Sequence, residues 1–141
     1  MPELPEVETT RRGIELLVRD CRIEGVEVRQ GALRQPVPGD LSSRLRGARF
    51  GSIGRRAKYL LVGTSVETLL VHLGMSGSLR VVDGGEDLRT HDHLIFHLED
   101  GRQLRYHDPR RFGIVIWGGE DPQQHPLLEK IGPEPLDNPE L

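Results

Sequence analysis

Apolar residues recur at helical spacing near the start of the chain. The residues concerned are Val7, Ile14, Leu17 and Val18. Steps of three, four and seven residues put side chains on one face of an α-helix. Pro5 suits the first turn of such a helix, and Glu6 and Glu8 suit its positive N-terminal end. The pattern therefore predicts a helix over residues 5–19.

Downstream of this helix, short apolar runs alternate with turn signals. Strands are predicted over residues 23–29, 48–53, 59–62, 68–73, 78–82, 93–98, 103–107 and 114–117. Turn residues at 83–85 and 99–102 separate neighbouring runs, and the second of these turns is a strong hairpin signal. Short helices are expected over 40–46 and 125–131, with a loop over 31–39. Regular short strands of this kind predict a mainly β fold, either a sandwich or a barrel.

The length and composition indicate one domain. A chain of 141 residues can bury a core without disulfides or metal. Its single cysteine, Cys21, excludes an intrachain disulfide and a zinc finger within these residues. No apolar run approaches 18 residues and no apolar signal region opens the chain, so we expect a cytoplasmic protein without a membrane partner. Residues 1–131 are expected to form the domain, and the Pro-rich residues 132–141 to begin a linker.

The net charge of −3 argues against a nucleic-acid binder, but the distribution of charge argues for one. Residues 41–66 contain no acid and six cations, namely Arg44, Arg46, Arg49, Arg55, Arg56 and Lys58. Arginine favours bidentate phosphate contacts, although a high-GC genome produces the same enrichment. We therefore expect residues 41–66 to face a polyanion.

The first residues can also carry chemistry. Removal of Met1 would leave Pro2 with a free secondary amine, and an α-amino group has a pKa of about 7.7–8.0. The neutral fraction near pH 7 can attack a carbonyl or acetal carbon and form an iminium ion. Glu3 stands one residue away and could move protons. Because many proteins begin with Met-Pro, the dipeptide alone does not establish catalysis.

Five segments, in order, carry a resemblance to a known family. They are MPELPEVETTRRG at 1–13, RRAKYL at 55–60, HLGMSGS at 72–78, HDH at 91–93 and DPRRFG at 108–113. With these segments the chain resembles the N-terminal catalytic domain of formamidopyrimidine-DNA glycosylase, the bacterial repair enzyme for oxidised purines. The resemblance implies an eight-stranded antiparallel β-sandwich, flanked by the N-terminal helix and short helices.

The resemblance also implies that the reaction would start at Pro2. Its nitrogen would attack the sugar carbon that bears the base, release the base and leave an iminium link to DNA. Glu3 would protonate or steer the opening sugar, and Lys58 would donate a proton or hold a phosphate. Successive β- and δ-elimination would then cleave the strand. In isolation, Lys58 would be an ordinary solvated charge at the end of a strand.

A glycosylase must flip its target base out of the duplex and fill the vacated space. The resemblance assigns this wedge to Met75, Arg110 and Phe112, and contacts with DNA phosphates to His72 and His91. Small flanking residues favour an exposed turn at Met75. Phe112 could equally be a core residue at the start of a strand.

Four charged residues are candidates for supporting roles, namely Glu6, Arg55, Arg56 and Arg111. Glu6 either holds hydrogen bonds inside the site or caps the helix dipole, and both interpretations stay open. The spacing of His91 and His93 could suggest a metal. With no cysteine partner and no third ligand at helical spacing, we expect no metal in this chain.

The resemblance covers only the first of the family's two domains. The second contains a helix-two-turn-helix element and a four-cysteine zinc finger, so zinc is expected in a longer parent protein and no cofactor in this chain. The expected partner is damaged double-stranded DNA, the parent is expected to be a monomer, and the isolated chain to be poorly active. One alternative is an endonuclease VIII-like glycosylase for oxidised pyrimidines, which Leu4 and the wedge set disfavour. The other is a non-catalytic module that binds DNA or protein.

Overall fold

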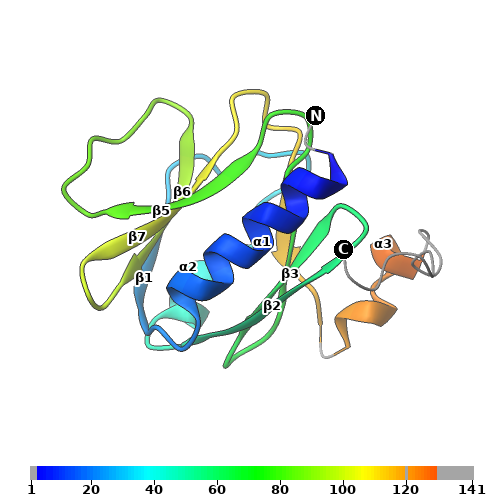
Figure 1. Cartoon of the computed structure of the whole chain (residues 1–141), viewed down its shortest axis with the longest axis horizontal. Helices are drawn as coiled ribbons and strands as arrows, with labels where there is room; N and C mark the ends of the chain where they lie inside the picture. The colour runs from blue at the N-terminus through cyan, green and yellow to red at the C-terminus, as the bar shows by residue number, and fades with distance from the viewer. Residues whose placement is uncertain (1–2, 120, 130–141) are drawn as a thin grey trace.

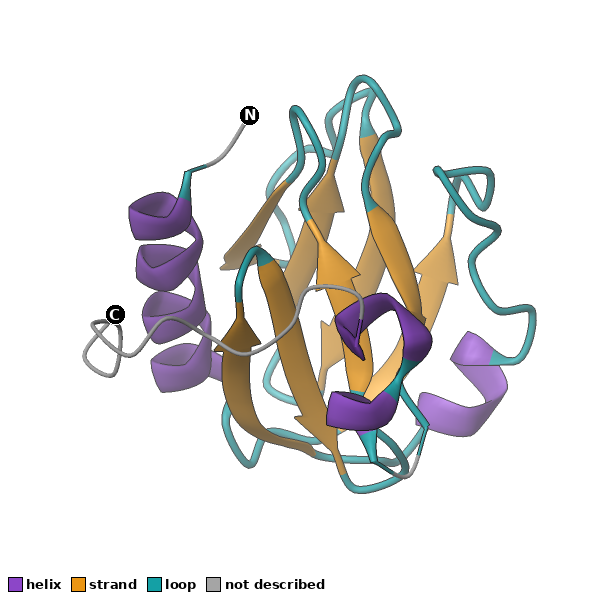
Figure 2. Ribbon diagram, turned by 90° about the vertical axis from the view of Figure 1, so that its right-hand side faces the viewer, coloured by secondary structure: helices purple, strands orange, loops and turns teal. Residues whose placement is uncertain are grey.

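The computed structural model describes residues 3–119 and 121–129, and two four-stranded antiparallel sheets form its centre. One sheet has the strand order β1-β6-β7-β5 and the other β2-β3-β4-β8 (Figures 1 and 2). The strands are β1 Ile23–Val28, β2 Phe50–Arg56, β3 Tyr59–Thr64, β4 Leu69–His72, β5 Ser78–Asp83, β6 Asp92–Leu98, β7 Arg102–His107 and β8 Ile114–Trp117. The prediction of an eight-stranded antiparallel β-sandwich with flanking helices is confirmed.

The apolar residues of both sheets meet in one core. Leu60 of β3 and Leu94 of β6 are fully buried, and the rings of Phe50 and Phe96 lie 5.9 Å apart across the sandwich. Alternate side chains of a strand point to the same face of its sheet, and these side chains point inward. The strand ends and their connecting loops lie outside this core and can present polar groups.

Helix α1, Leu4–Val18, covers the side of the sandwich where the edge strands β2 and β5 lie (Figure 1). Val7, Ile14 and Val18 are buried, as the helical spacing predicted, whereas Leu17 is half exposed. Covering an edge strand shields its unpaired backbone groups from another chain. The N-terminal helix therefore completes the sandwich.

The short helices are peripheral. Helix α2, Leu41–Leu45, packs beside β1, and the 3₁₀ helix η1, Pro122–Gln124, leads into α3, Pro126–Glu129. Leu128 of α3 packs with Leu61 and Leu70 in a small second cluster. Helices were predicted near both places. The end of the predicted helix 125–131 and the predicted linker 132–141 lie outside the described residues. Within the described ranges, no helix is long and apolar enough to span a membrane.

Strand β2 continues three residues beyond its predicted end. Arg56 pairs with Tyr59, so β2 and β3 are joined by a turn of two residues. Ala57 adopts a φ of 51° in this turn, and its carbonyl accepts a hydrogen bond from Arg55 Nη1 at 2.9 Å. The turn places Lys58 at the tip of a hairpin.

A buried ionic network fixes the long loop between β5 and β6. Arg105 is 1% exposed and donates hydrogen bonds to the loop carbonyls of Glu86 and Asp87 at 2.7 and 3.0 Å. Asp92, at the start of β6, is fully buried and accepts two hydrogen bonds from Arg80. Burial alone would raise the pKa of Asp92, but the hydrogen bonds from Arg80 and from the Arg89 N–H hold it well below its usual value. These contacts fix the backbone on either side of residue 91.

The carboxylate of Glu8 joins helix α1 to strand β2. It accepts hydrogen bonds from Arg11 and Arg12 of its own helix and, at 3.0 Å, from Nε of Arg55. The bonds from Arg11 contribute most to lowering the pKa of Glu8 to about 2, against the opposing effect of burial. An ionised Glu8 therefore holds the helix against the hairpin.

We predict that Glu8→Gln lowers the free energy of unfolding by about 2 kcal/mol at pH 7. The pKa of Glu8 is about 2 in the folded chain, against an ordinary value of 4.5. Its contribution is therefore complete above about pH 4.5 and is lost as the pH falls toward about 2. Urea unfolding followed by circular dichroism should show that the difference in the free energy of unfolding between variant and wild type shrinks over this pH range.

Glu24→Gln is the matched control, because Glu24 is an exposed acid on β1. This control should change stability by less than about 0.5 kcal/mol at every pH. If the difference in the free energy of unfolding between Glu8→Gln and wild type stays constant from pH 7 down to about pH 2, the role assigned to Glu8 is contradicted.

Candidate nucleic-acid interface

Two loops meet at one end of the sandwich, and we call them the paired loops. Residues 73–77 join β4 to β5, and residues 108–113 join β7 to β8. The Ser76 hydroxyl donates a hydrogen bond to Oδ1 of Asp108 at 2.8 Å and accepts one from the N–H of Arg110 at 3.1 Å. The paired loops are therefore one structural unit.

The Asp108 carboxylate is the centre of this unit. It is fully buried, and its Oδ1 accepts hydrogen bonds from the Ser76 hydroxyl and the Arg111 N–H. Its Oδ2 accepts hydrogen bonds from the Tyr106 hydroxyl at 2.7 Å and the Gly113 N–H at 2.9 Å. Burial, together with the bond to Asp108, raises the pKa of Tyr106 well above its usual range, so its hydroxyl remains a donor. Four donors thus satisfy a carboxylate that water does not reach.

Glycines allow the paired loops to approach this closely. Gly74 has a φ of 62°, and a Cβ there would lie 2.6 Å from the carbonyl carbon of Phe112. A Cβ on Gly113 would overlap the Tyr106 hydroxyl and lie 2.6 Å from the carbonyl oxygen of His72. Gly74 is therefore required where the two loops touch, and Gly113 is required where its loop packs on β4 and β7.

The paired loops hold the three predicted wedge residues at the surface. Met75 is 42% exposed and Phe112 is 48% exposed, so neither is a core residue. The guanidinium carbon of Arg110 lies 5.6 Å from the centre of the Phe112 ring. Met75 and Phe112 line a hollow of about 420 Å³ with Arg34, His72 and Gly74. This end of the molecule offers an apolar pair beside cations, the composition that base-step insertion uses. The wedge role itself stays a prediction.

Lys58 and His72 lie next to each other at the same end. Nζ of Lys58 is 4.0 Å from Oε1 of Glu3. His72 pairs with Tyr59 in the sheet, and the two rings are 4.8 Å apart. The fold therefore brings together residues 3, 58 and 72, which the sequence had suggested separately.

His72 is a neutral hydrogen-bond donor. Its Nδ1 accepts a hydrogen bond from the Gly74 N–H at 2.9 Å, which leaves the proton on Nε2. Burial lowers the pKa of His72, and the charges of Arg34 and Lys58 lower it further. A neutral imidazole between two cations can donate one hydrogen bond to an anion without carrying charge itself.

Glu6 fixes the start of helix α1. Its Oε1 accepts a hydrogen bond from the Glu3 N–H at 2.9 Å. Glu6 therefore acts at the helix N-terminus and holds the backbone of Glu3, while a role inside the site stays a prediction. Pro2, the predicted nucleophile, lies outside the described residues.

His91 lies on a second hollow, of about 440 Å³, which Arg29 and Arg111 also line. Its ring is 6.0 Å from that of His93 and 5.9 Å from that of His107. Nε2 of His93 is hydrogen-bonded to the carbonyl of Asp108 at 2.7 Å, so His93 supports the paired loops. No group of three or more metal-ligating side chains occurs among the residues that the structure describes.

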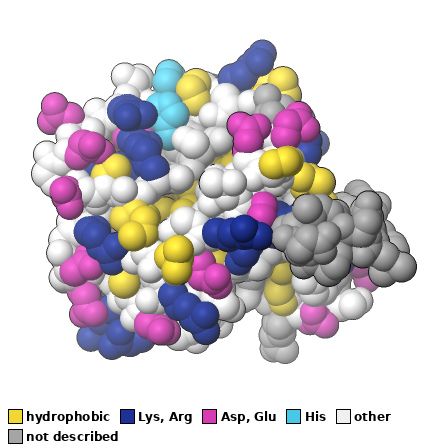
Figure 3. Space-filling view, viewed as in Figure 1, with side chains coloured by type: hydrophobic (Ala, Val, Ile, Leu, Met, Phe, Trp, Pro, Cys, Tyr) yellow, Lys and Arg dark blue, Asp and Glu magenta, His cyan; other side chains and the backbone are white. Residues whose placement is uncertain are grey.

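The six cations of residues 41–66 do not lie on a single surface, and the expectation that this stretch faces a polyanion stays a prediction. Arg49 and Arg56 stand at opposite ends of β2, which separates their backbones by roughly 20 Å. Arg44 pairs with Glu67 at 2.9 Å and stacks on Trp117. On the face that carries α1, acidic and basic side chains intermingle (Figure 3). An acid-free stretch folded into a hairpin spreads its charges over several faces.

Arg55 and Arg56 have structural partners. The Arg55 side chain is 5% exposed and pairs with Glu8, and Arg56 Nη1 is hydrogen-bonded to the Gln123 side chain at 3.0 Å. Arg55 thus supports the site by fixing the hairpin that carries Lys58. Direct support of DNA binding by Arg55, Arg56 or Arg111 stays a prediction.

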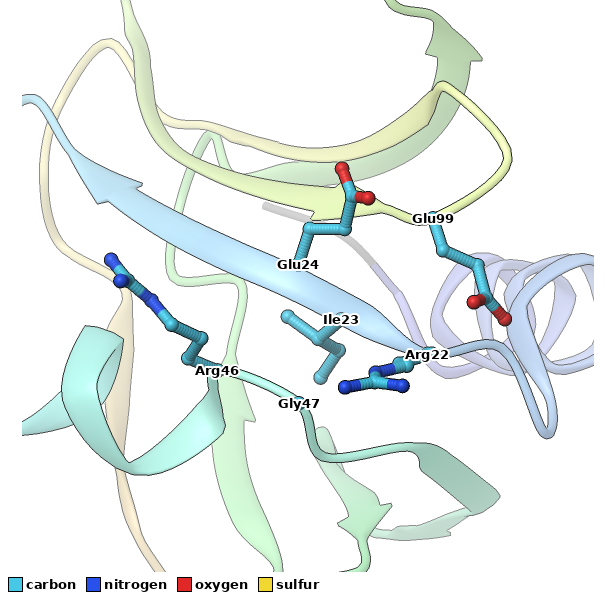
Figure 4. A pocket seen from close by; sticks show the side chains of 6 residues that line it. All are labelled: Arg22, Ile23, Glu24, Arg46, Gly47 and Glu99. Carbon is cyan, nitrogen blue, oxygen red and sulfur yellow. The ribbon is translucent and has the colours of Figure 1, made fainter.

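A third hollow, of about 490 Å³, lies at the opposite end of the sandwich. Figure 4 shows its lining residues, Arg22, Ile23, Glu24, Arg46, Gly47 and Glu99. Strand β1 begins here at Ile23 and ends at Val28, toward the hollow that contains His91. The lining balances two acids against two cations and contains none of the predicted site residues, so the paired loops remain the candidate interface.

Three residues of the interface were missed by sequence reasoning, namely Arg34, Ser76 and Asp108. The Arg34 N–H donates a hydrogen bond to the Gly113 carbonyl at 3.2 Å, which brings the loop at 31–39 to the paired loops. Asp108 precedes a proline, which predicts only a turn. No local pattern separates a buried loop carboxylate from an ordinary turn aspartate.

Known proteins match this chain in sequence and in structure. It is 59% identical over 136 residues to the formamidopyrimidine-DNA glycosylase of Thioalkalivibrio sulfidiphilus, which covers 96% of the chain and 50% of that protein. The enzyme of Methylococcus capsulatus is 55% identical over 137 residues, covering 97% of the chain and 51% of that protein. The chain therefore spans about half the length of these relatives.

Solved structures of a Lactococcus lactis relative share the fold. Its complex with DNA containing an abasic site superposes with a TM-score of 0.81 at 32% identity, covering 91% of this chain and 48% of that one. Its G226P mutant, bound to DNA containing Fapy-dG, gives a TM-score of 0.82 at 32% identity, covering 92% and 47%. In both, the matched part is about half of the solved chain.

The family model for the formamidopyrimidine-DNA glycosylase N-terminal domain matches residues 1–115. This range contains helix α1, all the strands up to the start of β8, and both paired loops. The chain belongs to the formamidopyrimidine-DNA glycosylase family.

Proposed function

We propose that this chain is the catalytic half of a DNA repair enzyme, a bifunctional glycosylase and lyase that removes oxidised purines from double-stranded DNA. One observation carries the proposal: the paired loops present Met75, Arg110 and Phe112 beside the cluster of Glu3, Lys58 and His72. A wedge next to a set of proton-transfer groups is what excision of a stacked base requires. The solved relatives with DNA containing an abasic site or Fapy-dG support the same partner.

The first step uses Pro2 after Met1 has been removed. The lone pair of the proline nitrogen attacks C1′ of the flipped nucleotide, and the bond from C1′ to the base breaks. The base leaves with that electron pair and takes up a proton. Ring opening then gives an iminium ion at C1′, and Glu3 supplies the proton that the ring oxygen O4′ requires.

The lyase step follows from the iminium ion. The cation acidifies the C2′–H bond, and loss of that proton expels the 3′ phosphate by β-elimination. A second elimination expels the 5′ phosphate. Lys58, 4.0 Å from Glu3, is placed to exchange protons with that carboxylate or to balance the charge of a phosphate. The Nε2–H of His72 would donate a hydrogen bond to a phosphate oxygen.

The wedge residues divide the task of replacing the lost base. Met75 and Phe112 are unbranched or flat and can enter between base steps, while Arg110 can pair with the base left without a partner. Unstacking costs a few kcal/mol, which DNA contacts must offset. Within this proposal the remaining half of the enzyme supplies further contacts and contains the zinc finger, while this chain needs no cofactor.

We predict that Pro2→Gly lowers the rate of base excision by about two orders of magnitude or more. Glycine keeps a primary amine but loses the secondary amine that forms the iminium ion. The test uses this chain joined to the second half of the Thioalkalivibrio sulfidiphilus relative, which we call the joined protein. Borohydride trapping on a duplex with one 8-oxoguanine measures the covalent adduct, and intact mass confirms that Met1 is absent.

Asp121→Asn is the control for trapping, because this acid follows the last strand and is exposed. Its adduct yield should match that of the unchanged joined protein. Trapping and excision by Pro2→Gly at the level of the unchanged protein would refute Pro2 as nucleophile. Faster excision from a duplex with one oxidised pyrimidine than from the duplex with 8-oxoguanine would favour the endonuclease VIII-like alternative.

We predict that Lys58→Ala flattens the salt dependence of duplex binding, whereas Arg44→Ala does not. Each phosphate contact contributes about 0.9 to the slope of log K against log salt. Arg44 is a matched cation from the same acid-free stretch, but its charge is paired with Glu67. Fluorescence anisotropy of the joined protein from 50 to 300 mM salt measures both slopes. Equal slopes for Lys58→Ala and the unchanged protein would show that Lys58 does not contact phosphate.

A further inference from the structure

We propose that Ser76 is a positioning residue that locks the two halves of the wedge into one rigid unit. The proposal rests on the proposed function, since it assigns the wedge to the paired loops. Met75 lies on one loop, and Arg110 and Phe112 lie on the other. A wedge built from two loops enters the base stack as a unit only if the loops cannot slide past each other.

The Ser76 hydroxyl links the loops through both of its hydrogen-bonding functions. The hydroxyl donates a hydrogen bond to Oδ1 of Asp108 at 2.8 Å, and its oxygen accepts a hydrogen bond from the Arg110 N–H at 3.1 Å. Ser76 is the residue next to Met75, and Arg110 is itself a wedge residue. One oxygen atom therefore connects the backbones on which two wedge side chains are mounted.

The other contacts of Asp108 allow the positioning role of Ser76 to be tested without a large loss of stability. Without the Ser76 hydroxyl, the carboxylate still accepts hydrogen bonds from Tyr106, Arg111 and Gly113. The buried charge stays satisfied and the core beneath it is untouched. Loss of the hydroxyl therefore removes the hydrogen bonds that join the loop at 73–77 to Asp108 and Arg110, at little cost to folding.

Precise placement matters because the wedge acts against the tendency of the bases to restack. Met75 and Phe112 are both half exposed, so packing alone does not immobilise them. Displacement of a positioning element by about 1 Å can cost about 100-fold in rate. A hydrogen bond to an ionised group is also among the stronger restraints that a short loop can have.

The experiment compares Ser76→Ala with Ser76→Thr, which retains a hydroxyl, in the joined protein. The matched control is Ser78→Ala, because Ser78 is an exposed serine two residues away. Wedge insertion is followed by the fluorescence of 2-aminopurine placed beside a tetrahydrofuran abasic analogue. Single-turnover excision of 8-oxoguanine, affinity for undamaged duplex and the melting temperature are measured on the same proteins.

Ser76→Ala should slow excision and insertion about tenfold, in line with the loss of a hydrogen bond to a charged group. Affinity for undamaged duplex should stay within twofold, since phosphate contacts dominate it. Ser76→Thr should recover most of the rate, and Ser78→Ala should match the unchanged protein. Melting temperatures should differ by less than about 4 °C across the set.

Two results would overturn the proposal. One is insertion and excision at unchanged rates in Ser76→Ala. The other is an equal fall in both the excision rate and the melting temperature of Ser76→Ala and Ser76→Thr. A general loss of folding would then explain the slower excision. Failure of the proposed function is a separate outcome, because the joined protein with Ser76 intact would then give neither trapping nor a fluorescence change.

Discussion

The carboxylate of Asp108 accepts four hydrogen bonds in a place that water does not reach, and the candidate interface is assembled around it. A buried charge costs several kcal/mol unless it is fully satisfied. Its four donors come from β7 and from both paired loops, so satisfying the charge brings these segments together. The paired loops, which on their own would be short surface segments, are anchored to the folded core through this one group.

A second ionic contact works in the same way at the N-terminus. Glu8 and Arg55 are 47 residues apart in sequence and meet at 3.0 Å. Their pairing fixes helix α1 against the hairpin that carries Lys58, and Glu6 fixes the backbone of Glu3. Glu3 and Lys58, the groups proposed to transfer protons, are thus held by contacts outside the site itself, while their own side chains remain accessible.

Periodicity was sufficient for α1 and for the number of strands, because burial of one face imposes a regular pattern on the sequence. It failed at the end of β2, where Gly54, Arg55 and Arg56 show no apolar alternation and the pairing with β3 is made by backbone hydrogen bonds. The resemblance named the exposed residues of the interface. It assigned no role to Ser76 and Asp108, whose mutual hydrogen bond joins residues more than 30 positions apart in the chain. Charge counting did not show how the cations of residues 41–66 are distributed, since the sign of a stretch says nothing about the faces on which its side chains lie.

The tautomer of His72 has a consequence for how the protein would hold a phosphate. Burial and the charges of Arg34 and Lys58 lower the pKa of His72, and its Nδ1 accepts the Gly74 N–H, so the neutral ring keeps its proton on Nε2. An uncharged donor displaces no condensed counterion when it meets DNA. The hydrogen bond from His72 would therefore depend less on salt than the ionic contacts around it, leaving one fixed point of registration on the strand.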